Sequence, residues 1–168
     1  PDNSAFTYIG NAATSATVRV VTSQDAIIPR VITSAIDIYE PDLRATVFIN
    51  DLNGAPAEPG DILEYTVTGK NIGSDISLNT FMETTLNIRT EYIPNTIEYL
   101  NGGFVGPKTD ISGDDQAEYD VVNRIVRTRI NTGADATNGG TMMNSPSGAD
   151  STSVKFRVQV VDDCIILD

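Results

Sequence analysis

An acidic stretch between Asp110 and Asp120 is the part of this sequence with the clearest capacity for chemistry. It holds five carboxylates in eleven residues and no basic residue. Packing that much like charge together costs repulsion unless a cation offsets it. All of its potential ligands are hard oxygen atoms, which suit Ca²⁺ because that ion takes about six to eight oxygens in flexible geometry. We therefore predict a calcium site with the ligands Asp110, Ser112, Asp114, Asp115, Glu118 and Asp120.

The spacing of the oxygen ligands within this stretch distinguishes it from one common class of calcium loop. Asp110, Ser112 and Asp114 alternate as the first three ligands of many calcium loops do. Asp115 stands where an EF-hand loop would have its glycine, so the stretch is not an EF-hand. A solvated acidic turn is the alternative interpretation, because runs of charge usually face water.

The composition excludes several classes of catalytic site. The chain has no histidine, which removes Ser-His-Asp and Cys-His catalysis and histidine-ligated zinc. Its one cysteine, Cys164, cannot form a disulfide within the chain. Cys164 begins an apolar run, so it is either a small hydrophobic residue in a strand or the partner of a cysteine beyond this sequence.

A glycosidase would need two carboxylates across a sugar-binding cleft, and Glu64, Glu83 and Glu98 qualify by residue type alone. Their alternation with apolar neighbours indicates outward strand positions, and the chain has no tryptophan for stacking on a sugar. We therefore expect no enzymatic activity. An intramolecular isopeptide bond from Lys70 or Lys155 is a further option, but such a bond requires a buried lysine.

The net charge of −12 and the pI near 4.2 bear on the possible partners. Nucleic acid and anionic membrane surfaces both require a basic footprint, so we expect neither as a partner. No apolar run approaches the length that crosses a bilayer.

Alternation of apolar and polar residues with period two dominates the chain and predicts strands. The clearest runs are 153–160, 62–69, 43–49 and 124–130, and weaker strands fit 17–21, 31–39 and 96–100. In the run 43–49 we expect Leu43, Ala45, Val47 and Ile49 to face inward. In the run 124–130 we expect Val126, Thr128 and Ile130 to be buried and Arg127 and Arg129 to face water. Turn sequences rich in glycine and asparagine separate the runs. The predicted fold class is all-β, an antiparallel two-layer sandwich.

The order of landmarks from about Pro41 onward resembles the family called domain of unknown function eleven. These are immunoglobulin-like repeats of bacterial secreted and surface proteins. The matching pieces include Asp51-Leu-Asn-Gly54, Pro59 to Val67, Asn71-Ile-Gly-Ser74, Tyr92 to Thr96 and Ser153 to Val160. Lys70 and the segment Thr85-Leu-Asn-Ile-Arg89 depart from the usual family pattern.

The resemblance implies an immunoglobulin-like antiparallel β-sandwich over 42–168, which we expect to be cut at its C-terminus. We expect residues 1–41 to be the tail of an upstream β-module or added edge strands. The implied function is that of a non-catalytic structural or spacer module of a bacterial secreted or cell-surface protein, of the adhesin or surface-motility type. Its expected partners are neighbouring modules of the same polypeptide, and a surface protein or glycan is a further option. The alternative is a ligand-binding adhesin domain whose site lies in the long polar loops, 101–108 and 132–150.

Overall fold

The computed structural model describes residues 13–28, 30–31, 39–145 and 150–162. The chain divides into two compact units, Pro1–Asp37 and Ile38–Asp168. The described residues of the first unit form neither strand nor helix, so the weak strand predicted over 17–21 is wrong. Most of the predicted strand 31–39 and the residue Cys164 lie outside the described residues. A search of the described residues for a helix that could cross a membrane finds none.

The described part of the second unit is built from strands, as the alternation predicts. Their bounds are β1 (Leu43–Asp51), β2 (Ile62–Asn71), β3 (Ser77–Thr85), β4 (Thr90–Tyr92), β5 (Glu98–Tyr99), β6 (Gly106–Pro107), β7 (Ala117–Asp120), β8 (Ile125–Arg129), β9 (Gly140–Met142) and β10 (Ser151–Val160).

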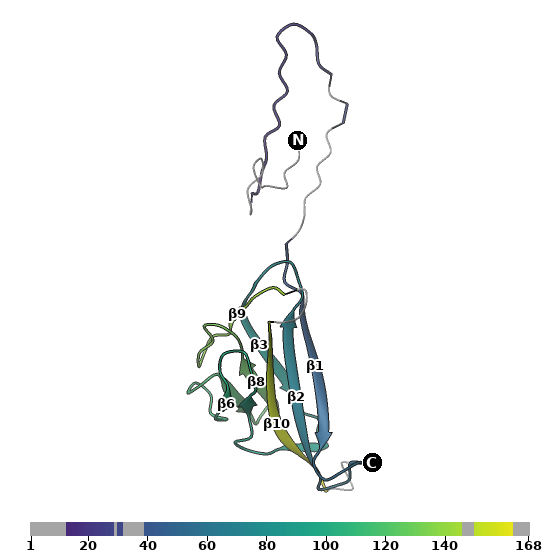
Figure 1. Cartoon of the computed structure of the whole chain (residues 1–168), viewed down its shortest axis with the longest axis vertical. Coiled ribbons are helices and arrows are strands. Elements are labelled where there is room, and N and C mark those ends of the chain that lie inside the picture. Colours follow the sequence, from purple (N-terminus) through teal and green to yellow (C-terminus); the bar gives the residue numbers. More distant parts are fainter. Residues whose placement is uncertain (1–12, 29, 32–38, 146–149, 163–168) are drawn as a thin grey trace. The chain divides into compact units, whose positions relative to one another are not determined.

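Two antiparallel sheets are formed by these strands (Figure 1). The larger sheet has the order β1-β2-β10-β5-β6, and β4 also pairs with β10. The smaller sheet has the order β7-β8-β3-β9. The predicted all-β, antiparallel class is therefore confirmed, and the arrangement is sandwich-like.

The core lies between the inward faces of the two sheets. From the larger sheet Val67, Phe156 and Val158 are buried, and from the smaller sheet Met82 and Ile130 meet them. These positions follow the period-two alternation expected for 62–69, 124–130 and 153–160. The strand predictions for these segments are confirmed together with their core faces.

The strand β1 is correctly predicted, but its expected burial is wrong. Its apolar positions alternate as in β2, yet Leu43, Val47 and Ile49 each keep about half of their surface exposed, 49%, 52% and 49% respectively. The cause is the position of β1 at the edge of the larger sheet, where it is paired on one side only. Periodicity gives the direction of a side chain but not whether the opposite sheet extends far enough to cover it.

The strands β1 and β10 run in the same direction along the two edges of β2. β1 pairs with β2 antiparallel from Leu43, opposite Asn71, to Asp51. β10 pairs antiparallel with the other edge of β2, beginning with Ser151 opposite Lys70. The chain therefore enters this unit at one end of β2 and leaves β10 at the other end. Ten residues of strand separate these ends by roughly 30 Å.

Candidate functional site

The acidic stretch folds as a short loop followed by a strand. Asp120 and Glu118 belong to β7, and only the residues before Ala117 form a loop. This loop is fixed on both sides, because the backbone of Tyr119 donates to the carbonyl of Asp110 at 3.0 Å. The alternation within β7 sends Ala117 to the core and Glu118 to the opposite face.

Most of the predicted calcium ligands are occupied by hydrogen bonds within the loop and its neighbours. Asp110 accepts from the hydroxyl of Tyr92 at 2.5 Å and from the backbone N–H of Asn95 at 2.7 Å. Asp115 accepts from the backbone N–H groups of Thr109 and Ala117, at 2.9 and 2.8 Å. These bonds are those of side chains that cap turns.

The two remaining aspartates, one in the middle of the stretch and one at its end, have different hydrogen-bond partners. Asp114 accepts from the hydroxyl of Thr109 at 2.7 and 2.8 Å. Asp120 accepts from the backbone and side-chain N–H groups of Asn123 in the hairpin between β7 and β8. The hydrogen bonds from Asn123 lower the pKa of Asp120. Each aspartate thus stabilises its own turn.

Glu118 belongs to a row of charges that crosses the smaller sheet and has Arg127 at its centre. The strand register places Arg127 of β8 opposite both Glu118 of β7 and Glu83 of β3. Arg127 forms ion pairs of 2.6 Å with each of these carboxylates. Arg129, two residues further along β8, donates to the same Glu118 oxygen at 3.0 Å. One cation between two anions in a cross-strand row is a stabilising arrangement.

The ion pair between Glu118 and Arg129 is buried, with side-chain exposures of 7% and 9%. The prediction that Arg129 faces water is therefore wrong. The carboxylate of Glu118 is buried beside the guanidinium under the loop and offsets its charge. The hydroxyl of Ser112 donates to the other oxygen of Glu118 and helps to close the loop over it. Burial opposes ionisation of Glu118, but the hydrogen bonds from Ser112 and Arg127 and the charge of Arg129 outweigh burial and lower the pKa of Glu118.

The structure therefore does not bring the six predicted ligands around one point. Within the described residues, no group of three or more acidic or cysteine side chains has the geometry to hold a metal ion. The sequence suggested a loop without basic residues, whereas β8 supplies Arg127 and Arg129 from further along the chain. A carboxylate has about four lone-pair positions, so these bonds do not use up its capacity. Calcium binding stays a prediction.

The glutamates that qualified by type for acid–base catalysis lie on outer faces in ion pairs. Glu64 of β2 pairs with Arg157 of β10 at 3.0 Å, and Glu98 of β5 pairs with Lys155 of β10 at 3.1 Å. Glu83 belongs to the charge row of the other sheet. Lys155 also lies 4.0 Å from Glu64, so Glu64 and Glu98 share this cation and line one small hollow of about 170 Å³. Glu83 lies apart from them, on the other sheet.

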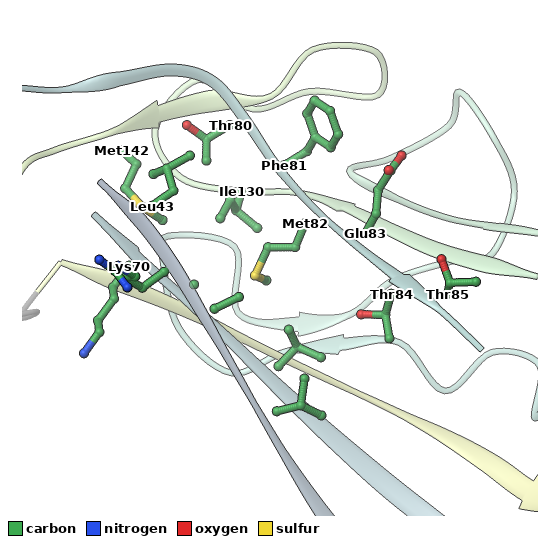
Figure 2. A pocket seen from close by; sticks show the side chains of 15 residues that line it. Leu43, Lys70, Thr80, Phe81, Met82, Glu83, Thr84, Thr85, Ile130 and Met142 are labelled. Atoms are coloured by element: carbon green, nitrogen blue, oxygen red, sulfur yellow. The ribbon is translucent and has the colours of Figure 1, made fainter. Parts of the chain in front are cut away.

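An open groove of about 410 Å³ lies between β1 and β3, on the side where β1 overhangs the smaller sheet. Figure 2 shows Leu43, Met82, Ile130 and Met142 pointing into this space. Its polar lining consists of threonines and Glu83 of β3 together with Arg44 of β1 and Lys70 of β2. The groove was not anticipated from the sequence, because it depends on how far one sheet extends beyond the other.

Two small residues in register explain the volume of the groove. Gly69 of β2 lies opposite Ala45 of β1, so at this level the two strands β1 and β2 contribute only one methyl group to the inward face. The side chain of Met82 fills part of the space: a Cβ built at Gly69 would lie 2.8 Å from its sulfur. The remaining space opens to solvent beside Ala45.

Comparison of the chain with protein-family models finds no match. Comparison with curated proteins likewise finds none.

Proposed function

We propose that the unit Ile38–Asp168 is an immunoglobulin-like, non-catalytic structural module that acts as a spacer in a secreted or cell-surface protein. The observation that carries this proposal is the direction of β1 and β10. Both run antiparallel to β2 along nine of its ten residues, so the chain enters at one end of the unit and leaves at the other. A unit of this kind extends a polypeptide by roughly the length of its strands.

Three further observations support the proposal. The order of landmarks in the sequence resembles immunoglobulin-like repeats of bacterial surface proteins. The two antiparallel sheets share one core, as expected of such a repeat. The described acidic side chains that could serve in catalysis, Glu64, Glu83 and Glu98, are engaged in ion pairs with arginine or lysine.

Calcium remains part of this proposal, as a stabilising ion of the acidic loop. Its support is chemical: five carboxylates occur in eleven residues, and the oxygen atoms suit a hard cation. The neighbouring modules of the same polypeptide are the proposed partners.

The proposal is tested by presenting the full chain to a panel of glycans and extracellular proteins and to broad hydrolase and lyase substrates. We expect no turnover and no saturable binding. Saturable binding that is lost on substituting residues in the loop 101–108 or 132–150 would replace the spacer with the adhesin alternative. Turnover abolished by Glu64→Gln, Glu83→Gln or Glu98→Gln would replace it with an enzyme.

A further inference from the structure

We propose that β1, β2 and β10 form a mechanical clamp that resists tension along the chain, and that the ladder between β1 and β2 sets the force at which the unit opens. The term clamp refers to these three strands throughout. β2 lies between the other two, with nine registered pairs on each side (Figure 1). The clamp itself follows from the strand register, and only its use in a cell rests on the proposed spacer function.

The direction of the strands decides how tension reaches the hydrogen bonds. Tension through Glu40 and Asp162 draws the first residue of β1 one way and the last residue of β10 the opposite way. Both strands are then pulled along β2 rather than away from it. Hydrogen bonds of an antiparallel pair are perpendicular to the strands, so sliding loads many of them together. Peeling would instead break them one after another.

The entry point of the clamp is held by an additional set of bonds. The carbonyl of Glu40 accepts from the backbone N–H groups of Ser74 and Asp75, at 2.9 and 3.2 Å. The backbone of Asp42 accepts from Ile72 at 2.9 Å. A Cβ at Gly73 would lie 2.4 Å from the Glu40 carbonyl oxygen, so this close approach requires glycine.

The exit point is held in a similar way. Val160 exchanges backbone hydrogen bonds with the turn before β2, donating to the carbonyl of Asp61 at 2.8 Å and accepting from Gly60 at 3.0 Å. Val161 donates to the carbonyl of Arg89 at 3.0 Å. A pull on Asp162 therefore loads these hydrogen bonds before it loads the ladder between β10 and β2.

The two ladders of the clamp differ in the side chains that reinforce them. Between β2 and β10, Arg157 pairs with Glu64 at 3.0 Å, and the hydroxyls of Thr68 and Ser153 are 2.8 Å apart. The inward side chains of β10 are buried, whereas β1 has half-exposed apolar residues on that face and a free outer edge. β1 is therefore the strand that separates first, and its ladder with β2 determines the opening force.

The hydrogen bonds at the two ends of β1 identify which of its residues bond to β2. Asp42 accepts from Ile72, and Leu52 donates to Ile62, both at 2.9 Å. In an antiparallel ladder every second residue exchanges bonds with its partner. The even-numbered residues between these ends, such as Thr46, therefore bond to β2. The backbone N–H of Ala45 points to the free edge instead.

The experiment compares two directions of pulling on the same fold by single-molecule force spectroscopy. In the full chain carrying Cys164→Ser, handles are attached through Glu40→Cys and Asp162→Cys, or through Glu40→Cys and Asp75→Cys. The first pair slides β1 along β2, and the second peels β1 from the end where Glu40 lies beside Asp75. We expect a several-fold higher unfolding force for the first pair. Equal forces, or a higher force on peeling, overturn the clamp.

A pair of adjacent proline substitutions then tests the assignment of the ladder in the sliding geometry. Thr46→Pro removes a backbone donor to β2, whereas Ala45→Pro removes one that faces the free edge, where proline is tolerated. We expect Thr46→Pro to lower the unfolding force several-fold and Ala45→Pro to change it little. Equal losses, or no loss for either variant, contradict the assignment. If Thr46→Pro does not fold, the comparison of pulling directions alone decides. Because neither measurement involves a ligand, failure of the clamp is distinguishable from failure of the spacer function.

Discussion

The side chain of Asn71 accepts a hydrogen bond from the backbone N–H of Asp42 at 3.0 Å and thereby fixes the start of β1 to the end of β2. Asn71 is fully buried. The same oxygen accepts from Gly73 at 3.0 Å, and its amide nitrogen donates to the carbonyl of Asp75 at 2.7 Å. One side chain thus organises both the entry of the chain and the turn from β2 to β3.

We predict that Asn71→Ala lowers the free energy of unfolding by about 2–4 kcal/mol, because several part-buried backbone groups lose the hydrogen bonds of one buried side chain at once. The measurement is urea unfolding of the full chain. Asn50→Ala on the exposed outer side of β1 is the matched control, and it should change stability by less than about 0.5 kcal/mol. A similar small effect for both variants would show that Asn71 does not hold the entry.

A second prediction concerns the buried pair of Glu118 and Arg129. Glu118→Gln keeps the size of the side chain but removes the charge that offsets Arg129, so at pH 7 it should cost about 2–4 kcal/mol. Because the fold lowers the pKa of Glu118, the unfolded chain binds more protons than the folded chain in the acidic range. The stabilisation is therefore present above the ordinary glutamate pKa of about 4.3 and is lost as the pH falls through the folded value.

The measurement is the difference in unfolding free energy between the unmodified chain and Glu118→Gln from pH 7 down to pH 3. The difference should shrink toward the acidic end, while the control Glu91→Gln, at an exposed position, should give a small difference throughout. A difference that stays constant with pH would contradict the proposed role of the Glu118 charge.

The strands of the core could be predicted from the sequence because alternation is a local property. Val154, Phe156 and Val158 alternate with polar residues, and all three are buried. The same alternation in β1 led to a wrong prediction of burial, because the exposure of Val47 depends on the extent of a sheet formed by other segments. Alternation of strand residues carries no information about that extent.

The candidate site was harder to predict for a related reason. Composition alone suggested that Glu118 needs a cation, and it has one, but the cation is an arginine side chain from β8. The alternation of Arg127 and Arg129 places them on one face, which is the signal that could have suggested a cross-strand charge row. Choosing between that row and a calcium site requires the register of β7 and β8, which depends on tertiary contacts.

Calcium binding to the acidic loop is a third prediction. With a dissociation constant on the order of 10⁻⁴ to 10⁻³ M and tenfold more free calcium, linkage adds roughly 1.4 kcal/mol to stability. Thermal unfolding in calcium should therefore occur at a higher temperature than in magnesium or chelator, because magnesium demands a tight octahedron.

Asp114→Asn and Asp120→Asn should reduce this calcium-dependent increase, and the exposed Asp162→Asn should not. Asp120 also caps a turn, so its variant is compared through the increase and not through the melting temperature itself. An unchanged melting temperature across calcium, magnesium and chelator at low ionic strength would leave the loop as a set of hydrogen-bonded turns without a metal.

The last prediction uses the groove beside Ala45. Ala45→Val places two methyl groups in a space that is open and lined by Val47, Met82 and Met142. It should raise the free energy of unfolding by about 0.5–1.5 kcal/mol, because apolar surface of the added and neighbouring groups leaves water. Part of any gain would come from the higher strand propensity of valine, so the control must have a similar propensity change with less apolar burial. Ala45→Thr supplies that comparison, because threonine also favours strands and has nearly the shape of valine but carries a hydroxyl in place of one methyl group. Urea unfolding of both variants should show the larger gain for Ala45→Val. Equal gains would mean that strand propensity alone is responsible, and a loss for Ala45→Val would mean that Met82 already needs the space.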